Sequence, residues 1–306
     1  MRFNSDITIA IPVYERYEFF EDALMSAVDQ TVRCNVIVVD NCSSHNLFEQ
    51  CVLRLNLPHV TYHRNAQNLG AIGNWNTCIN LPQTKWITIL HSDDMLSLEY
   101  VDILSRSIDS KKEEICFMTR YEAEAHPNYI IKTVGKPFFR FLKIKKGYFI
   151  FGNPTAFPGV LFNKEILQGH HFVEELQTVA DYDFWFKIAK IKPITLINIK
   201  LALYRVSEGQ DSATAYRKVI RESYKYKVQQ ITGKNIFFKI IAMYELFYTY
   251  RYYKQKFDIV EKVYKPFEEN EINVYFKIFE RFNIKSCLDI LFKSYRKSYL
   301  YISSLF

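Results

Sequence analysis

Short apolar runs alternate with helical patterns through the first 125 residues of this 306-residue chain. The four clearest apolar runs cover residues 7–13, 35–40, 59–63 and 85–90. Each is followed by a helical pattern; after the first run, apolar residues between Phe19 and Val28 recur on one helical face. Strands that alternate with helices and are apolar on both faces are typical of a parallel sheet covered on both sides. The pattern therefore predicts an α/β fold with a doubly wound, mostly parallel sheet.

Charged residues follow the predicted strands. Asp40 ends the second run, and Asp93 with Asp94 follows the fourth run in "ILHSDDM" (89–95). Ligands of such sheets bind beyond the carboxyl ends of the strands, where these acids and Arg64 can face one crevice. The chain has neither a GxxxxGKS/T loop nor a GxGxxG turn, so a phosphate group would need another source of positive charge. Two carboxylates at this edge can hold a divalent cation, and the cation can hold a diphosphate. An aspartate pair is equally common at a helix start, so the pair alone leaves both interpretations open.

Basic residues are concentrated in the C-terminal part of the chain. Residues 217–306 hold 18 Lys and Arg against 9 Asp and Glu (net +9), whereas residues 1–216 hold 22 against 24 (net −2). A near-neutral domain with a basic, aromatic-rich appendage argues against a nucleic-acid binder. The appendage has a helical pattern at 235–257, which suits a helix on an anionic membrane surface and equally a helix packed on the first domain.

Cysteine spacing and apolar run lengths indicate the compartment. The six cysteines form no CxxC pair and no His-linked metal spacing, which favours reduced core thiols. The N-terminal apolar run is too short for a signal peptide, and no stretch reaches the roughly 18 uninterrupted apolar residues of a membrane span. The sequence therefore predicts a cytoplasmic protein.

Five motifs resemble, in order and spacing, those of the family 2 glycosyltransferases. They are "IPVYERYEFFEDALMSAVDQT" (11–31), "VIVVDNCSS" (36–44), "RNAQNLGAIGNWN" (64–76), "LHSDD" (90–94) and "ADYDFWFKIAK" (180–190). Members of that family are inverting enzymes with the GT-A fold. The resemblance covers residues 7 to about 212 and implies a GT-A catalytic domain over residues 1–212, whereas composition and helical pattern predict a basic, aromatic-rich helical C-terminal region over residues 213–306.

The resemblance also implies a nucleotide-sugar site at the carboxyl edge of the sheet. The residues that would contact the donor are Pro12, Tyr14, Glu15, Asp40, Asn68, Gly70, Asn74, Asp93 and Arg205. Among them Pro12, Tyr14 and Asp40 resemble the pocket for the base and ribose, and Arg205 would neutralise phosphate. Taken singly, these residues also suit strand ends and hydrogen-bonded turns.

The same resemblance gives the central motifs their roles. Asn68, Gly70 and Asn74 resemble the segment that closes over the nucleotide. Asp94 would bind Mn²⁺ or Mg²⁺ directly, and Asp93 would lie beside it at the ribose and diphosphate. A cation across two phosphates stabilises the negative charge of a departing nucleoside diphosphate.

Asp181 matches the general base of the family. In inverting transfer, an acceptor hydroxyl attacks the anomeric carbon opposite the leaving group and needs a carboxylate to take its proton. Asp183 lies two residues further and would point elsewhere on a helix, so we rank it second. Asp181 is also a natural N-cap for the following helix.

Some positions depart from the family pattern. His91 replaces a frequent acid, Ala180 stands where an acid commonly precedes the base, and Ser207 replaces a histidine that often follows Tyr-Arg. These departures leave a non-catalytic module that binds nucleotide or glycan as an alternative. A nucleotidyltransferase would also use paired aspartates and a metal, but the chain lacks an early Gly-rich basic loop for a triphosphate.

The sequence thus predicts an inverting glycosyltransferase that moves a sugar to a hydroxyl of a glycan or lipid-linked acceptor in cell-surface polysaccharide synthesis, as in the O-antigen type. A UDP-sugar is the favoured donor because it is commonest in the family, and GDP-mannose and dTDP-rhamnose remain open. Nucleic acid is not an expected partner. Peripheral membrane contact through the C-terminal helices is an open alternative.

Overall fold

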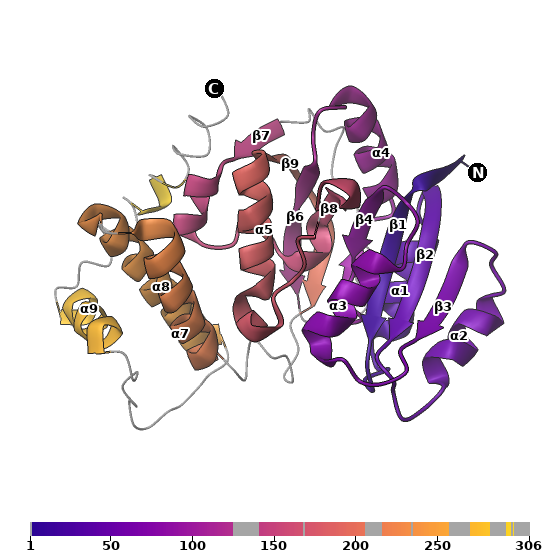
Figure 1. Ribbon diagram of the computed structural model, residues 1–306, viewed down its shortest axis with the longest axis horizontal. Coiled ribbons are helices and arrows are strands. Elements are labelled where there is room, and N and C mark those ends of the chain that lie inside the picture. Colours follow the sequence, from indigo (N-terminus) through magenta and orange to yellow (C-terminus); the bar gives the residue numbers. More distant parts are fainter. Residues whose placement is uncertain are drawn as a thin grey trace.

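The computed structural model describes residues 2–124, 141–167, 169–205, 216–233, 235–256, 270–281, 292–294 and 296. Nine strands in these ranges form one mixed sheet (Figure 1). The strands are β1 (Arg2–Val13), β2 (Val32–Asp40), β3 (Val60–Arg64), β4 (Trp86–Ile89), β5 (Met95–Leu96), β6 (Cys116–Glu124), β7 (Phe141–Ile144), β8 (Val160–Asn163) and β9 (Ile194–Arg205). Their order is β3-β2-β1-β4-β8-β6-β9-β5, and β7 pairs with β9.

Most of the strands share one direction. The pairs β1/β2, β1/β4, β2/β3 and β6/β9 are parallel, whereas β8, β5 and β7 each pair antiparallel to their neighbours. Val13 pairs with Asp40, and Asp40 pairs with Arg64, so the carboxyl ends of the first three strands lie level. The prediction of a doubly wound, mostly parallel sheet is confirmed.

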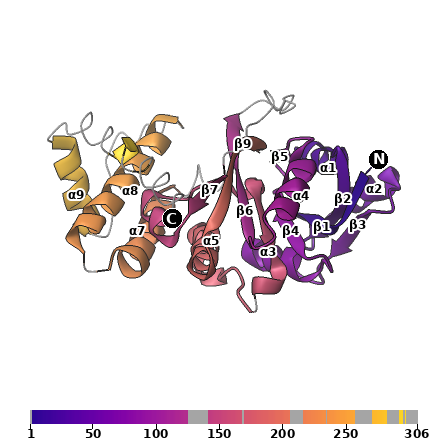
Figure 2. The same ribbon diagram turned by 90° about the horizontal axis from the view of Figure 1, so that it is seen from above.

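Helices cover both faces of the sheet (Figure 2). Helices α1 (Phe20–Val28), α2 (Leu47–Leu55) and α4 (Tyr100–Ser110) lie on one face, and α3 (Gly70–Asn80) and α5 (Ala180–Ile191) lie on the other. Successive side chains of a strand point to opposite faces. In β1, Ile9 and Ile11 therefore enter the core with α1, α2 and α4, whereas Ala10 enters the core with α3 and α5.

Short turns of 3-10 helix link the later strands to α5. They are η1 (Lys146–Phe151), η2 (Phe157–Gly159), η3 (Lys164–Leu167) and η4 (Glu174–Val179). The helix predicted from about Ser97 begins at Tyr100 instead. The reason is that Met95–Leu96 pairs with β9 and the Ser97 backbone N–H donates to Leu201.

The C-terminal helices pack beside α5 on the same face of the sheet (Figures 1 and 2). They are α7 (Tyr216–Tyr226), the π-helical turn η5 (Lys227–Thr232), α8 (Ile236–Lys256) and α9 (Asn270–Arg281). Met243, Leu246 and Phe276 are buried in one core cluster with Phe184 and Trp185 of α5. The helix predicted at 235–257 is present as α8, and its buried side packs against the first domain, which was one of the two alternatives.

The first turn of α8 keeps apolar side chains on the surface. Ile236, Phe237 and Ile240 are 62%, 54% and 41% exposed. Within the described ranges, no helix combines the length and the apolar character needed to cross a bilayer. The predicted boundary at 212/213 and the departure at Ser207 lie outside the described residues, so both stay predictions.

Candidate functional site

The loop after β1 is fastened to the loop after β2 by hydrogen bonds. Glu15 has a left-handed backbone (φ 54°), which is uncommon for a residue other than glycine. Its backbone N–H donates to Ser43 Oγ at 3.0 Å, and its carboxylate accepts the N–H and hydroxyl of Ser44, both at 2.8 Å. These bonds from Ser44 lower the pKa of Glu15. Pro12 is buried before this loop, and Tyr14 is 45% exposed at its surface.

Asp40 lies at the end of β2 with its side chain fully buried. Its Oδ1 accepts the N–H of Ser43 at 2.9 Å and the Ser43 hydroxyl at 2.6 Å. Its Oδ2 accepts Tyr62 Oη at 2.7 Å and pairs with Arg64 Nη1 at 2.9 Å. Four donors therefore hold this carboxylate, and it joins the turn after β2 to the end of β3.

An amide network fixes the segment between β3 and α3. Asn41 Nδ2 donates to Asn68 Oδ1 at 2.8 Å and to the Gly70 carbonyl at 3.1 Å. Asn65 Nδ2 donates to Asn41 Oδ1 at 3.1 Å and to Asn74 Oδ1 at 2.9 Å. The predicted residues Asn68, Gly70 and Asn74 are thus brought together through Asn41 and Asn65, which lie in the matched motifs but were not among the predicted site residues.

Asp93 and Asp94 lie between β4 and β5 next to His91. Ligand atoms of these three residues all lie within 4.8 Å of one another. The Asp94 side chain is 1% exposed, its Oδ1 accepts the Arg205 backbone N–H at 3.0 Å, and its Oδ2 is buried without a hydrogen-bond partner. Burial, followed by repulsion from Asp93, raises the pKa of Asp94 well above its ordinary value. A divalent cation would relieve both effects, so this set of residues fits one.

Arg205, at the end of β9, contacts Asp93 and Asp94, which together with His91 form what we call the acidic set. Its side chain is 1% exposed, its Nε donates to the Asp93 carbonyl at 2.8 Å, and its Nη2 pairs with Asp22 at 2.9 Å. The guanidinium also lies over the Phe19 ring, 4.3 Å from its centroid. Arg205 is therefore next to the acidic set and holds α1 and the Asp93 loop through these bonds, whereas its contact with phosphate stays a prediction.

Asp181 lies in the first turn of α5, one position after the residue at which the helix begins. It does not occupy the N-cap that the sequence suggested, because Val179 does. Its Oδ2 accepts Asn153 Nδ2 at 2.8 Å, and its Oδ1 accepts the Tyr182 N–H at 2.7 Å. Burial raises the pKa of Asp181 to about 6, against the lowering effect of these hydrogen bonds. A carboxylate with such a pKa can take a proton near neutral pH.

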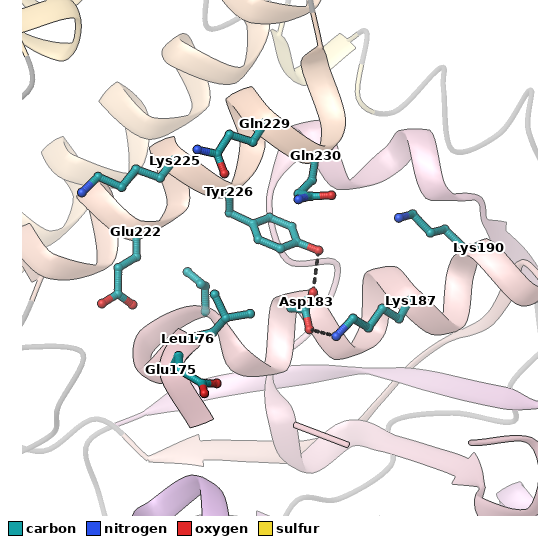
Figure 3. A pocket seen from close by; sticks show the side chains of 11 residues that line it. Glu175, Leu176, Asp183, Lys187, Lys190, Glu222, Lys225, Tyr226, Gln229 and Gln230 are labelled. Carbon is teal, nitrogen blue, oxygen red and sulfur yellow. Dashed lines mark hydrogen bonds and ion pairs between the residues drawn. The ribbon is translucent and has the colours of Figure 1, made fainter. Parts of the chain in front are cut away.

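Asp183, two residues after Asp181 on α5, lines a pocket of about 470 Å³ between α5 and the helices α7 and η5 (Figure 3). Its Oδ1 accepts Tyr226 Oη at 2.9 Å, and its Oδ2 pairs with Lys187 Nζ at 2.7 Å. Oδ1 thus joins α5 to α7, whereas Oδ2 is engaged within α5 itself. This position supports the lower rank given to Asp183 as a base.

The structure sorts the predicted residues into three groups. Glu15, Asp40, Asn68, Gly70 and Asn74 belong to the hydrogen-bonded loops, whereas Asp93 and Asp94 belong to the acidic set, with Arg205 beside it. In the described part of the chain, no hydrogen bond or ion pair joins Asp181 to either group.

An aromatic stack next to the acidic set was not predicted. Trp75 lies 5.2 Å from the His91 ring, and Phe157 lies 4.4 Å from it on η2. Phe157 also contacts Trp185 of α5 at 5.7 Å. This stack connects the acidic set to the helix that carries Asp181. Trp75, His91 and Trp185 each lie within a matched motif, but nothing in the sequence indicated that Phe157 would bring them together.

These features define a class of protein: a mixed, mostly parallel α/β sheet of the GT-A type with C-terminal helices and an acidic set at its carboxyl edge. The family model described as "Glycosyl transferase family 2" matches residues 8–167, slightly more than half of the chain. The chain therefore belongs to glycosyl transferase family 2, as its motifs predicted, and its activity is glycosyl transfer from a nucleotide-sugar donor.

Known proteins of similar sequence or structure agree with this assignment. An uncharacterised glycosyltransferase of Methanocaldococcus jannaschii is 23% identical over 236 residues, which cover 75% of this chain and 80% of that protein. Residues 1–349 of the S. aureus protein TarS, in complex with UDP-GlcNAc, match the fold with a TM-score of 0.60 at 15% identity, over 90% of this chain and 78% of that TarS segment. The mannosyltransferase PcManGT of Pyrobaculum calidifontis, in complex with GDP-Man and Mn²⁺, matches with a TM-score of 0.57 at 11% identity, over 98% and 86%. At these identities, the two structures show the fold alone.

Proposed function

We propose that the protein is a metal-dependent, inverting glycosyltransferase in which Asp181 is the general base. The observation that carries this proposal is the environment of Asp181, a carboxylate in the first turn of α5 that is fixed by Asn153 and has a pKa of about 6. The acceptor hydroxyl oxygen attacks the anomeric carbon, and Asp181 takes the hydroxyl proton. The bond between the anomeric carbon and the diphosphate oxygen breaks, and its electron pair leaves with the nucleoside diphosphate.

Asp94 and Asp93 would hold Mn²⁺ or Mg²⁺ in this proposal. When bound, the cation supplies a Lewis acid that stabilises charge on the leaving diphosphate. The buried Asp94 Oδ2, which makes no hydrogen bond, supports its role as a direct ligand. From the end of β9, Arg205 holds Asp93 through its backbone carbonyl and Asp94 through its side chain.

The favoured donor is a UDP-sugar, held by the loops that follow β1, β2 and β3. TarS binds UDP-GlcNAc, which supports this choice, and the GDP-Man bound to PcManGT supports the main rival. A thermal-shift comparison of UDP, GDP and dTDP with Mn²⁺ tests which nucleobase the donor carries. We expect UDP to give the largest shift, and a larger shift with GDP would contradict the proposal.

Replacement of the base tests the reaction itself. Asp181→Asn keeps the shape of the side chain, so UDP affinity should stay within a few fold while transfer falls by about 10³ to 10⁴, the upper range for loss of a general base. Asp183→Asn is the matched control on the same helix, and it should lower stability more than rate because Asp183 joins α5 to α7. Activity retained in Asp181→Asn but lost in Asp183→Asn would show that Asp183, and not Asp181, is the general base. Nucleotide binding by the unmutated protein without any turnover would instead support a non-catalytic module.

The proposed acceptor is a hydroxyl of a glycan or of a lipid-linked glycan, used in cell-surface polysaccharide synthesis. A lipid-linked acceptor would bring the protein to a membrane, and the exposed Phe237 and Ile240 in the first turn of α8 support such contact next to a basic tail. Flotation with anionic phospholipid vesicles tests this. Phe237→Glu combined with Ile240→Glu should reduce flotation, whereas Leu53→Glu, on the distant α2, should not. If the unmutated protein fails to float, the proposed membrane contact is wrong.

A further inference from the structure

The imidazole of His91 faces the one oxygen of Asp94 that has no hydrogen-bond partner. His91 Nδ1 lies 3.9 Å from Asp94 Oδ2, which is too long for a hydrogen bond. Two atoms that each bind one cation at about 2.1 Å are normally separated by roughly 3 Å, so a small rotation of either side chain would place both on the same ion. The carboxylate of Asp93 lies within the same 4.8 Å span and provides a third ligand atom.

The ring of His91 is held in this orientation by the aromatic stack. It lies nearly parallel to Trp75, with an interplanar angle of 23°, and it packs on Phe157 at 33°. The side chain is 25% exposed, so the ring is not fully closed off from solvent. A ligand that is already oriented loses little freedom when it binds a metal.

We propose that His91 is a ligand of the cation together with Asp93 and Asp94, and that this nitrogen ligand makes the site select Mn²⁺ or Co²⁺ over Mg²⁺. The inference rests on the proposed metal-dependent function and deepens it. Mg²⁺ strongly favours oxygen ligands, whereas first-row transition metals bind imidazole well. The replacement of an acid by His91, which the sequence first marked as a departure from the family pattern, then becomes a determinant of metal choice.

Two substitutions at position 91 separate ligation from packing. His91→Phe keeps an aromatic ring between Trp75 and Phe157 but removes the nitrogen. His91→Asp restores an oxygen ligand but removes the stacking. Full-length protein with UDP is titrated calorimetrically with Mn²⁺, Co²⁺ and Mg²⁺, and thermal unfolding without metal shows whether each variant is folded.

The unmutated protein should bind Mn²⁺ at least about tenfold more tightly than Mg²⁺, and His91→Phe should lose about tenfold or more in Mn²⁺ affinity while remaining folded. His91→Asp should reduce the preference for Mn²⁺ over Mg²⁺. Pulsed electron paramagnetic resonance of bound Mn²⁺ gives a direct readout, because a coordinated imidazole nitrogen modulates the signal. This modulation should be present in the unmutated protein and absent in His91→Phe.

Failure of this inference can be distinguished from failure of the proposed function. If Mn²⁺ binds His91→Phe as tightly as the unmutated protein and no nitrogen modulation is seen, His91 is a stacked aromatic residue only, and the metal role of Asp93 and Asp94 stands. If neither Mn²⁺ nor Mg²⁺ binds the unmutated protein with UDP, both the inference and the metal dependence are wrong. The role of Asp181 is tested separately by its own variants.

Discussion

Protonation of the Asp181 carboxyl group should slow glycosyl transfer at acidic pH. Burial raises its pKa to about 6, and a general base acts only in its deprotonated form. We therefore expect kcat/KM to rise with pH through about 6 and then to level off. A rate profile measured on both sides of this pH tests the expectation, and a rate that stays constant well below pH 6 would contradict it.

The same raised pKa has a consequence for stability. A carboxyl that binds its proton more tightly in the folded state stabilises the fold at low pH, and this contribution is lost as pH rises from the ordinary value of 3.8 through about 6. Asp181→Asn cannot ionise, so its free energy of unfolding should improve relative to the unmutated protein across that interval. Urea unfolding of both proteins at several pH values measures the difference. A difference that is independent of pH would mean that Asp181 titrates normally.

At the scale of elements, η1 links the base to the C-terminal helices. Gly152 ends η1 with φ 100°, and a Cβ there would lie 2.7 Å from Glu245 Oε1 of α8. The next residue, Asn153, holds Asp181. Gly152→Ala should therefore destabilise the protein and also lower transfer, because Glu245 or the turn must shift.

Gly169→Ala is the matched control for this substitution. Gly169 also has a left-handed backbone (φ 89°), but a Cβ there meets open space. Gly169→Ala should lower the free energy of unfolding only by the backbone strain, about 1–2 kcal/mol, with little effect on transfer. Urea unfolding and initial rates measure both variants. Equal effects of the two substitutions would show that contact with Glu245 does not matter.

The elements that could be predicted are those with a local signal. Apolar periodicity locates the first four strands and their helices, and the family motifs select Asp93, Asp94 and Asp181. The insertion of β8 between β4 and β6 has no such signal, because it depends on pairings between distant short strands. Asn153 could not be predicted for the same reason, since its contact with Asp181 spans 28 residues and is decided by how η1 packs on α5.

At the scale of the whole molecule, a buried ion pair holds the C-terminal helices together. Lys227 of η5, 2% exposed, pairs with Glu245 of α8, and burial lowers the pKa of this lysine while Glu245 opposes the change. Lys227→Met leaves the Glu245 carboxylate buried without its cation, which should cost about 3–5 kcal/mol. Combining it with Glu245→Leu removes both charges and should recover much of that loss.

Chemical unfolding of the two single variants and the double variant measures this coupling. Additive effects would show that the two side chains do not interact. The same unfolding curves show whether the C-terminal helices unfold together with the sheet, because η5 and α8 share a core with α5. A single unfolding transition is expected for the unmutated protein, and a separate early transition of the C-terminal helices would contradict that shared core.

The position of Arg205 has a consequence for how the protein is made. Its contacts with Asp94, Asp93 and Asp22 span 111, 112 and 183 residues. A ribosome releases the acidic set long before Arg205 and the rest of β9 have been synthesised. Under the proposed function, a nucleotide therefore meets a complete site only after the last long strand of the sheet has been added.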